Sequence, residues 1–253
     1  MNADHIAEQE SQGDTSPRRM EKTVIYLTRH GWREDWDNAE WKRTASLPYD
    51  PSLSNLGLKQ AMELGIALSS AGVKRIYCSP YYRCVQTANE VANASATLSN
   101  PIPICLENGL SEKFSEVEAK KHVAGIPDRR SREELFPDCP HLDADYSSLV
   151  EKYAWVYETK EMVLERGKKV SAVLGEIATR ERGTFLIVTH ASVLISLVRA
   201  FLDDDKLDIR SAVCSITKLV YDEEKLIWKM KIKGDCSHLA EGEQRPYSFS
   251  DEK

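Results

Sequence analysis

The stretch VIYLTRHG, residues 24–31, decides the fold, because a run of strand-forming residues ends abruptly in an arginine, a histidine and a glycine. Its first five residues suit a buried strand, whereas Arg29 and His30 are costly to bury. The pattern occurs again in FLIVTH, residues 185–190, where an apolar strand ends in His190. Two such strands predict polar groups gathered at one edge of a sheet.

Strand and helix patterns alternate along the rest of the chain. The predicted order after the first strand is helix 55–72, strand 75–79, a helix after Pro80, strand 103–106, a helical tract over about 147–181, strand 185–189, helix 191–202 and a hairpin of strands 215–222 and 226–232. Parallel strands need crossovers, and helical crossovers cover both faces of the sheet. The pattern therefore predicts an α/β three-layer sandwich, with a mainly parallel sheet, helices on both faces and an antiparallel edge.

The length of 253 residues favours one domain with a full core. Residues 1–22 are polar and lack apolar periodicity, so they are interpreted as a disordered tail. The domain is predicted over 23–240, with 113–146 as a lid or substrate-loop insertion and 241–253 as a C-terminal tail. The insertion is rich in charges and holds no sustained period.

Composition excludes several classes of protein. No apolar run approaches the ~20 residues of a membrane helix, and the start has no secretory signal pattern. The formal charge of −6 argues against direct binding of nucleic acid. The six cysteines form no CxxC pairs, which favours reduced thiols and a location in the cytoplasm, the nucleus or both.

Four polar groups are expected to meet at the carboxyl ends of the strands, where ligands bind in such sheets. They are Arg29, His30, Arg83 and His190. Guanidinium groups form paired hydrogen bonds with phosphate oxygens, and a neutral imidazole can attack phosphorus. The set predicts phosphoryl transfer.

Three motifs in the same order resemble the histidine phosphatase superfamily, also called phosphoglycerate mutase-like. They are RHG at 29–31, SPYYRCVQT at 79–87 and VTH at 188–190. The resemblance implies that His30 is the phosphorylated nucleophile and that Arg29, Arg83 and His190 hold the phosphoryl group. It also implies that Glu112, which follows a Gly-Leu pair, is the general acid.

Two further residues are candidates for substrate binding. His238, in GDCSHL at 234–239, resembles a late family segment near the phosphate pocket, but a surface histidine is an equal alternative. Arg33 would extend the basic pocket or would be a charge on its rim. Cys78 and Arg83 are separated by four residues, one fewer than in a cysteine-based phosphatase loop, so a thiol nucleophile is not expected. No metal and no cofactor are implied.

The resemblance implies a metal-independent, acid-type phosphatase that works through a phosphohistidine. His30 must be neutral to attack, and two nearby arginines are expected to disfavour its protonation. A mutase is a weaker interpretation, because GLSEKF at 109–114 departs from the Glu-Arg-x-Tyr-Gly pattern of family mutases.

The motifs look closer to a eukaryotic branch than to the mutases, and this branch contains the suppressor of T-cell receptor signalling phosphatases and a phosphatase-like subunit of the yeast RNA polymerase III initiation factor. The expected partner is accordingly a phosphorylated small molecule or a phosphoprotein. The alternative is a scaffold subunit of a multiprotein, transcription-related assembly that binds proteins through 113–146.

Overall fold

A six-stranded sheet forms the centre of the protein, in a computed structural model that describes residues 22–95, 101–114, 129–150 and 157–249. The strands are β1 (Val24–Arg29), β2 (Val73–Cys78), β3 (Ile104–Leu106), β4 (Thr184–Thr189), β5 (Ile216–Asp222) and β6 (Ile227–Asp235). Their order in the sheet is β3-β2-β4-β1-β5-β6. Strands β1 to β4 pair in parallel, and β5 and β6 pair antiparallel. The predicted mainly parallel sheet with an antiparallel edge is confirmed.

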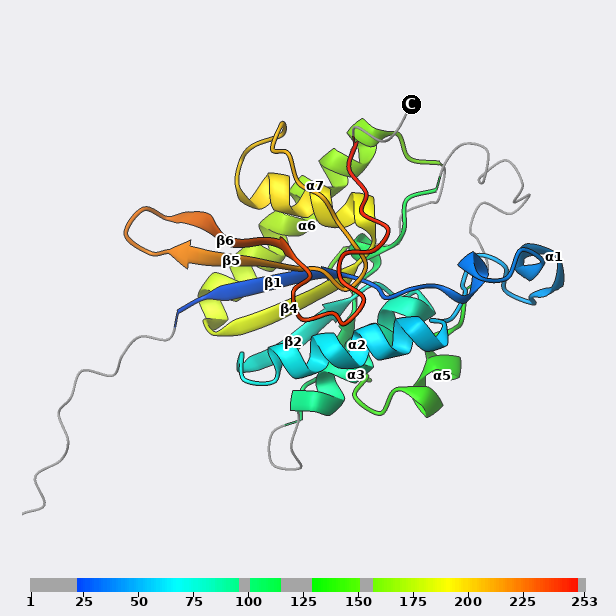
Figure 1. Ribbon diagram of the computed structural model, residues 1–253. Helices are drawn as coiled ribbons and strands as arrows, with labels where there is room; N and C mark the ends of the chain where they lie inside the picture. The colour runs from blue at the N-terminus through cyan, green and yellow to red at the C-terminus, as the bar shows by residue number, and fades with distance from the viewer. Residues whose placement is uncertain (1–21, 96–100, 115–128, 151–156, 250–253) are drawn as a thin grey trace, which may run out of the picture.

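Helices cover both faces of this sheet (Figure 1). The longer helices are α2 (Asn55–Leu68) and α3 (Tyr82–Ser95) on one face, and α6 (Lys160–Glu181) and α7 (Ala191–Phe201) on the other. The short helices are α1 (Trp41–Thr44), α5 (Arg132–Leu135) and the 3-10 turns η1 (Glu34–Trp36), η2 (Asn108–Leu110) and η3 (Phe136–Asp138). The three-layer α/β arrangement predicted from the alternating pattern is therefore present.

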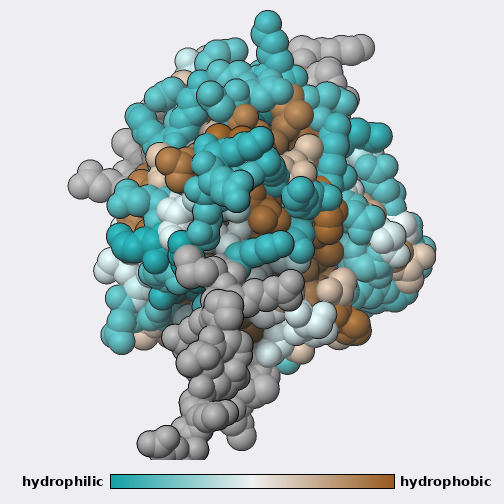
Figure 2. Space-filling view, turned by 90° about the vertical axis from the view of Figure 1, so that its left-hand side faces the viewer, coloured by the Kyte–Doolittle hydropathy of each residue, from teal (hydrophilic) through white to brown (hydrophobic). Residues whose placement is uncertain are grey.

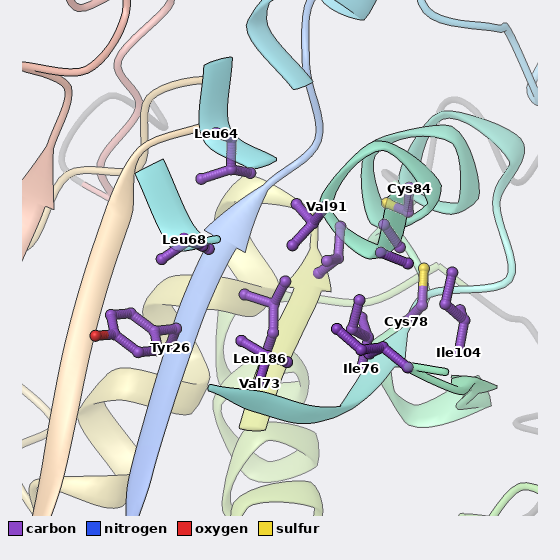
Figure 3. Close-up of a cluster of buried hydrophobic side chains, with 14 of the residues drawn as sticks. Tyr26, Leu64, Leu68, Val73, Ile76, Cys78, Cys84, Val91, Ile104 and Leu186 are labelled. Atoms are coloured by element: carbon purple, nitrogen blue, oxygen red, sulfur yellow. The ribbon is translucent and has the colours of Figure 1, made fainter. Parts of the chain in front are cut away.

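The position of β1 inside the sheet explains why its sequence is continuously apolar rather than alternating. Val24 and Tyr26 belong to the core cluster under α2 and α3, whereas Ile25 and Leu27 belong to the cluster under α6 and α7. Successive side chains of a strand point to opposite faces, so a strand covered on both faces needs apolar residues at every position. Figure 3 shows the first cluster, in which Leu64 of α2 and Val91 of α3 lie over the sheet.

Two glycines bring the loop after β1 into direct contact with the start of α2. A Cβ atom on Gly57 would lie 2.1 Å from the carbonyl oxygen of Trp32, and one on Gly31 would lie 2.6 Å from the carbonyl oxygen of Gly57. Ser54 caps this helix by accepting a hydrogen bond from the Gly57 backbone N–H. The close backbone approach fixes the residues that follow the first strand.

The substitution Gly57→Ala should destabilise the fold, because the added methyl group meets backbone that cannot move independently. We expect a loss of about 1–3 kcal/mol in the free energy of unfolding, the usual range for overpacking. Urea denaturation followed by circular dichroism measures it. Ile66→Ala is the control, since Ile66 lies on the same helix and is 70% exposed. Equal stability of the two variants would contradict the expectation.

The predicted helical tract over 147–181 is wrong at 147–150 and 157–159, which are not helical, and α6 starts at Lys160. The buried carboxylate of Glu107 accepts hydrogen bonds from the backbone N–H groups of Leu149 and Val150, at 2.8 and 3.2 Å, and from the hydroxyl of Ser148. These bonds replace those of a helix, so the chain at 148–150 is irregular. Helical spacing alone did not reveal this competing acceptor.

Some predictions lie outside the described residues. They include the disordered tail, apart from residue 22, and the middle of the proposed insertion at 115–128. At the other end of the chain, residues 241–249 of the segment predicted as a tail pack on the domain, and Phe249 is only 3% exposed. None of the helices in the described ranges is both long and apolar enough to span a membrane. Figure 2 shows that hydrophilic residues cover most of one face, with hydrophobic areas between them.

Candidate active site

The two histidines meet because their strands are neighbours in the sheet. Arg29 is the last residue of β1 and pairs with Thr189, the last residue of β4, so His30 and His190 leave the sheet side by side. The backbone N–H of His30 donates to the carbonyl of Thr189 at 3.0 Å. The two imidazole rings have centroids 5.3 Å apart. Residues 160 positions apart are thus brought into contact by strand register.

Arg83 and Glu112 join the histidines from two other elements. Arg83 lies in the first turn of α3, which follows β2, and its side chain is 1% exposed. Glu112 follows η2 on the loop after β3. One oxygen of its carboxylate, Oε2, lies 3.3 Å from Arg83 Nη2 and 3.1 Å from His190 Nδ1. All the strands that carry these groups end at the same edge of the sheet, as predicted from the topology.

His30 is held in the tautomer that a nucleophile requires. Its Nδ1 lies 2.8 Å from the carbonyl oxygen of Gly31, which can only accept, so Nδ1 carries the proton and Nε2 carries the lone pair. Burial lowers the pKa of His30 well below its ordinary value, and Arg83 and Arg29 lower it further. The imidazole is therefore neutral at physiological pH. Burial, more than the expected arginines, is the main cause.

A chain of hydrogen bonds orients the second histidine. The backbone N–H of Tyr81 donates to Ser79 Oγ, and this hydroxyl lies 2.8 Å from His190 Nε2. Burial lowers the pKa of His190 to about 4, although the carboxylate of Glu112 raises it. A neutral His190 accepts the Ser79 proton on Nε2 and donates Nδ1–H to Glu112. Ser79 is a member of the site that sequence reasoning missed, although it lies in the SPYYR motif.

The carboxyl group of Glu112 is ionised in this arrangement. Burial on its own would raise the pKa of Glu112, but His190 and Arg83 lower it well below the ordinary value of a glutamate. A phosphoryl group that binds Arg83 would compete with this carboxylate for the same N–H donor. Anion binding is thereby linked to protonation of Glu112.

A pocket of about 280 Å³ opens onto these groups. Its lining residues are Arg29, Arg33, Lys42, Pro48, Tyr49, Arg83, Glu112, Lys113, Phe114, Ala191, Ser192 and Tyr247. His30 and His190 are 1% and 0% exposed and are not among the lining residues, but their ring nitrogens lie within 4.8 Å of the carboxylate of Glu112, which is. The lining of the pocket combines arginine and lysine side chains with aromatic rings. This composition suits an anionic group attached to a larger apolar body.

Arg29 depends on the end of the chain for its orientation. Its Nη1 donates to the carbonyl of Arg245 at 2.7 Å and to the carbonyl of Ser211 at 3.1 Å. The backbone of Tyr247 pairs with Ser211 in both directions, so this segment is firmly attached. Sequence reasoning missed Arg245 and Tyr247, because nothing in the polar stretch EGEQRPY indicates a contact with the first strand.

The two remaining sequence candidates are placed differently from each other. Arg33 lines the pocket, but its guanidinium already makes two bonds to Asp35, at 2.8 and 2.5 Å. His238 is not among the lining residues; its Nε2 lies 3.1 Å from the carbonyl oxygen of Cys214. The backbone N–H of Cys214 donates to the carbonyl of Arg29, so His238 reaches the site only through the backbone of Cys214.

One group in the described part of the chain has ligand-type atoms close enough for a metal ion. It consists of His30, Glu112 and His190, whose candidate atoms lie within 4.8 Å of one another. The guanidinium of Arg83 already contacts two of them, at 3.3 Å from Glu112 Oε2 and 3.3 Å from His190 Nδ1. This neighbouring fixed cation makes the site better suited to an anion.

The family model described as "Histidine phosphatase superfamily (branch 1)" matches residues 25–232. The chain belongs to this superfamily. The predicted resemblance is confirmed, and the match covers both strands that end in histidines. The motif residues Arg29, His30, Arg83 and His190 come from three separate segments of the chain, which the fold brings together.

Relatives of this superfamily member include a protein named as a phosphatase and one named as a subunit of a transcription factor. The ecdysteroid-phosphate phosphatase of Drosophila melanogaster is 30% identical over 213 residues, which cover 72% of this chain and 27% of the relative. The transcription factor tau 55 kDa subunit of Saccharomyces cerevisiae is 24% identical over 269 residues, covering 91% of this chain and 59% of the relative. Human ubiquitin-associated and SH3 domain-containing protein A is 31% identical over 156 residues, covering 60% and 23%. These relatives agree with the predicted eukaryotic branch, and this chain spans about a quarter to three fifths of their lengths.

Solved structures support the fold of this superfamily member. The silkworm ecdysone phosphate phosphatase in complex with tungstate aligns with a TM-score of 0.65 at 23% identity, covering 83% of this chain and 92% of the other. Phosphoglycerate mutase from Bacillus anthracis aligns with a TM-score of 0.57 at 24% identity, covering 88% and 97%. The phosphoglycerate mutase-like architecture predicted from the sequence is confirmed.

Proposed function

We propose that this protein is a phosphatase that hydrolyses a phosphomonoester through a phosphohistidine on His30. The observation that carries the proposal is the meeting of a neutral, tautomer-fixed His30 with Glu112 and His190, beside a pocket that Arg29, Arg83 and Glu112 line. Such a set supplies a nucleophile, charge-assisted donors for phosphoryl oxygens and a carboxyl group for proton transfer. Membership of the superfamily supports the same reaction.

The reaction takes two steps. In the first, His30 Nε2 attacks phosphorus, the bond between phosphorus and the alcohol oxygen breaks, and Glu112 gives its proton to the departing oxygen. In the second, the Glu112 carboxylate takes a proton from water, which attacks the phosphohistidine and releases phosphate and His30. Arg29 and Arg83 hold the phosphoryl oxygens during both steps, His190 donates its Nδ1–H to them in place of Glu112 once the group is bound, and the reaction uses no metal.

The substrate is proposed to carry a bulky apolar or aromatic body. Tyr49, Phe114 and Tyr247 line the pocket, while Lys42 and Lys113 add positive charge beside them. Aromatic walls exclude water from a large apolar group, and the lysines favour an anionic substrate. The fly relative is named for an ecdysteroid phosphate, an ester of this general kind. A phosphorylated small molecule or a phosphoprotein in the cytoplasm or the nucleus fits this description.

The test is turnover of p-nitrophenyl phosphate without added metal, together with trapping of radiolabelled protein during turnover. We expect an acid-labile phosphoryl adduct on the wild-type chain. A well-folded protein that neither hydrolyses the ester nor takes up label would overturn the proposal.

The pH dependence should be that of an acid-type phosphatase. The lowered pKa of His30 keeps this nucleophile neutral into the acidic range, whereas the lowered pKa of Glu112 leaves little of the acid form at neutral pH. We therefore expect kcat/KM for phenyl phosphate to fall as the pH rises from about 5 to about 8. The fall should be shallower for p-nitrophenyl phosphate, whose leaving group needs less protonation. A rate that rises with pH over this range would show instead that a nucleophile must first lose a proton.

An assembly subunit is the second candidate, because the yeast tau 55 kDa subunit aligns over 91% of this chain. In that case partner proteins would bind through 113–146, of which 129–146 carries the arginines Arg129, Arg130 and Arg132. The test is affinity capture from cell extract with wild-type and His30→Ala proteins. Capture of the same partners by both, without any turnover by wild type, favours the subunit.

A further inference from the structure

The segment Gly109–Phe114, here named the acid segment, determines where the carboxyl group of Glu112 lies. It begins within η2, and it also supplies Lys113 and Phe114 to the wall of the pocket. Most of it has no regular secondary structure, so neither a helix nor a sheet fixes its backbone. Its carbonyl groups must therefore find their partners elsewhere.

A buried arginine from another layer of the fold binds this backbone. Arg166 lies on α6 and is 2% exposed. Its Nη1 donates to the carbonyl of Gly109 and to the carbonyl of Ser111, both at 2.8 Å. Ser111 immediately precedes Glu112, so Arg166 holds the peptide from which the acid side chain projects.

A partly buried carboxylate completes the arrangement. Glu158 is 10% exposed and accepts from Arg166 Nε at 2.7 Å and from Arg166 Nη2 at 2.5 Å, a two-point contact that orients the guanidinium. The backbone N–H of Glu158 donates to the carbonyl of Phe114 at 3.0 Å. The side chain of Arg166 therefore binds the start and the middle of the acid segment, and the backbone of Glu158 binds its end.

The position of Arg166 is itself set by close helix packing. At the next residue, a Cβ atom on Gly167 would lie 2.6 Å from Ser196 Oγ of α7. Helix α7 starts directly after His190. The hydroxyl of the preceding residue, Thr189, donates to the carbonyl of Leu110 at 2.7 Å. The same packed elements therefore locate both His190 and the acid segment.

We propose that Arg166 and Glu158 are positioning residues for the general acid, because they fix the backbone of the acid segment and so set the distance from Glu112 to the leaving oxygen. This inference rests on the proposed phosphatase reaction. Arg166 touches no substrate; it acts through Glu112. Its removal should affect proton delivery more than nucleophilic attack.

The test uses two aryl esters of nearly the same shape and different need for an acid. p-Nitrophenolate leaves as a stable anion, whereas phenolate leaves readily only when it is protonated. We expect Arg166→Gln to lower kcat/KM for phenyl phosphate by roughly 100-fold, the lower range of a general-acid contribution, and that for p-nitrophenyl phosphate by less than roughly threefold. The ratio kcat/KM is the right quantity, because it reports the step that forms the phosphohistidine and excludes its later hydrolysis.

Further variants separate positioning from a general loss of structure. In a Glu112→Gln background, Arg166→Gln should produce no additional selective loss on phenyl phosphate, because the group it positions is gone. Arg166→Lys should restore part of the loss, since it keeps the charge and one donor. Arg75→Gln is the control for loss of an arginine, because Arg75 binds Glu181 and Tyr77 away from the pocket. Equal losses on both esters, or no loss on either, would overturn the inference.

If Arg166→Gln does not fold, Glu158→Gln provides a second test. Glu158→Gln keeps the backbone N–H that binds Phe114 and changes only the partner of Arg166. It should show the same selective loss on phenyl phosphate, and an unchanged ratio between the two esters would contradict the proposal. Failure of the wild type to hydrolyse either ester would instead contradict the proposed function itself.

Discussion

His30→Ala should lower kcat/KM for p-nitrophenyl phosphate by roughly 10⁴-fold or more, because removal of a covalent nucleophile leaves only binding and electrostatic stabilisation. The labelled adduct should also disappear. His30 is 1% exposed, so the loss of its ring leaves a small cavity and the variant is expected to fold. Circular dichroism and a thermal melt check this directly.

The matched control is His141→Ala. His141 is also a histidine on this chain, but its Nε2 lies 3.0 Å from Asn93 Oδ1, and it is not part of the pocket. We expect it to keep the rate and the adduct of the wild type. Label that persists in His30→Ala would show that another residue carries the phosphoryl group.

Arg83→Lys should give the second-largest effect, a loss of about 10²–10³-fold in kcat/KM, the scale reported for the removal of one oriented donor in a transition state. Lysine keeps the charge but loses the planar fork of donors that matches a phosphoryl group. In the wild-type structure, the guanidinium of Arg83 lies 3.3 Å from Glu112 Oε2 and 3.4 Å from the carbonyl oxygen of Tyr49. Inhibition by inorganic phosphate should weaken in parallel, which a competition assay measures.

Arg33→Lys is the comparison that makes this result specific. Arg33 lines the same pocket, yet Asp35 already takes two of its donors. We expect a loss of less than roughly tenfold, as for a partly neutralised charge near the rim. Similar losses in the two variants would mean that charge alone, without donor geometry, holds the phosphoryl group.

The meeting of these side chains in a candidate active site could be predicted in large part, because strand ends are easy to recognise. Arg29 and His190 follow continuous apolar runs, and parallel strands bring such ends to one edge. Glu112 is different, since it lies among several acidic residues on a loop. Only the family resemblance distinguished it. Its position depends on Arg166, which helical periodicity identifies merely as a residue of a long helix.

The walls of the pocket could not be predicted from local pattern. Tyr247 lies in a polar stretch with no period, and its place is set by backbone pairing with Ser211. The irregular chain at 148–150 was also missed, because a single buried carboxylate, Glu107, captures backbone N–H groups that a helix would otherwise use. Both features are long-range, and propensity reports only on near neighbours in sequence.

The bond from Arg29 to the carbonyl of Arg245 joins residues that are 216 positions apart. On the ribosome, β1 is synthesised well before this acceptor, because 216 positions separate the two residues. The anion pocket can therefore reach its final form only after Arg245 has left the exit tunnel. Completion of this centre lags far behind the synthesis of its first strand.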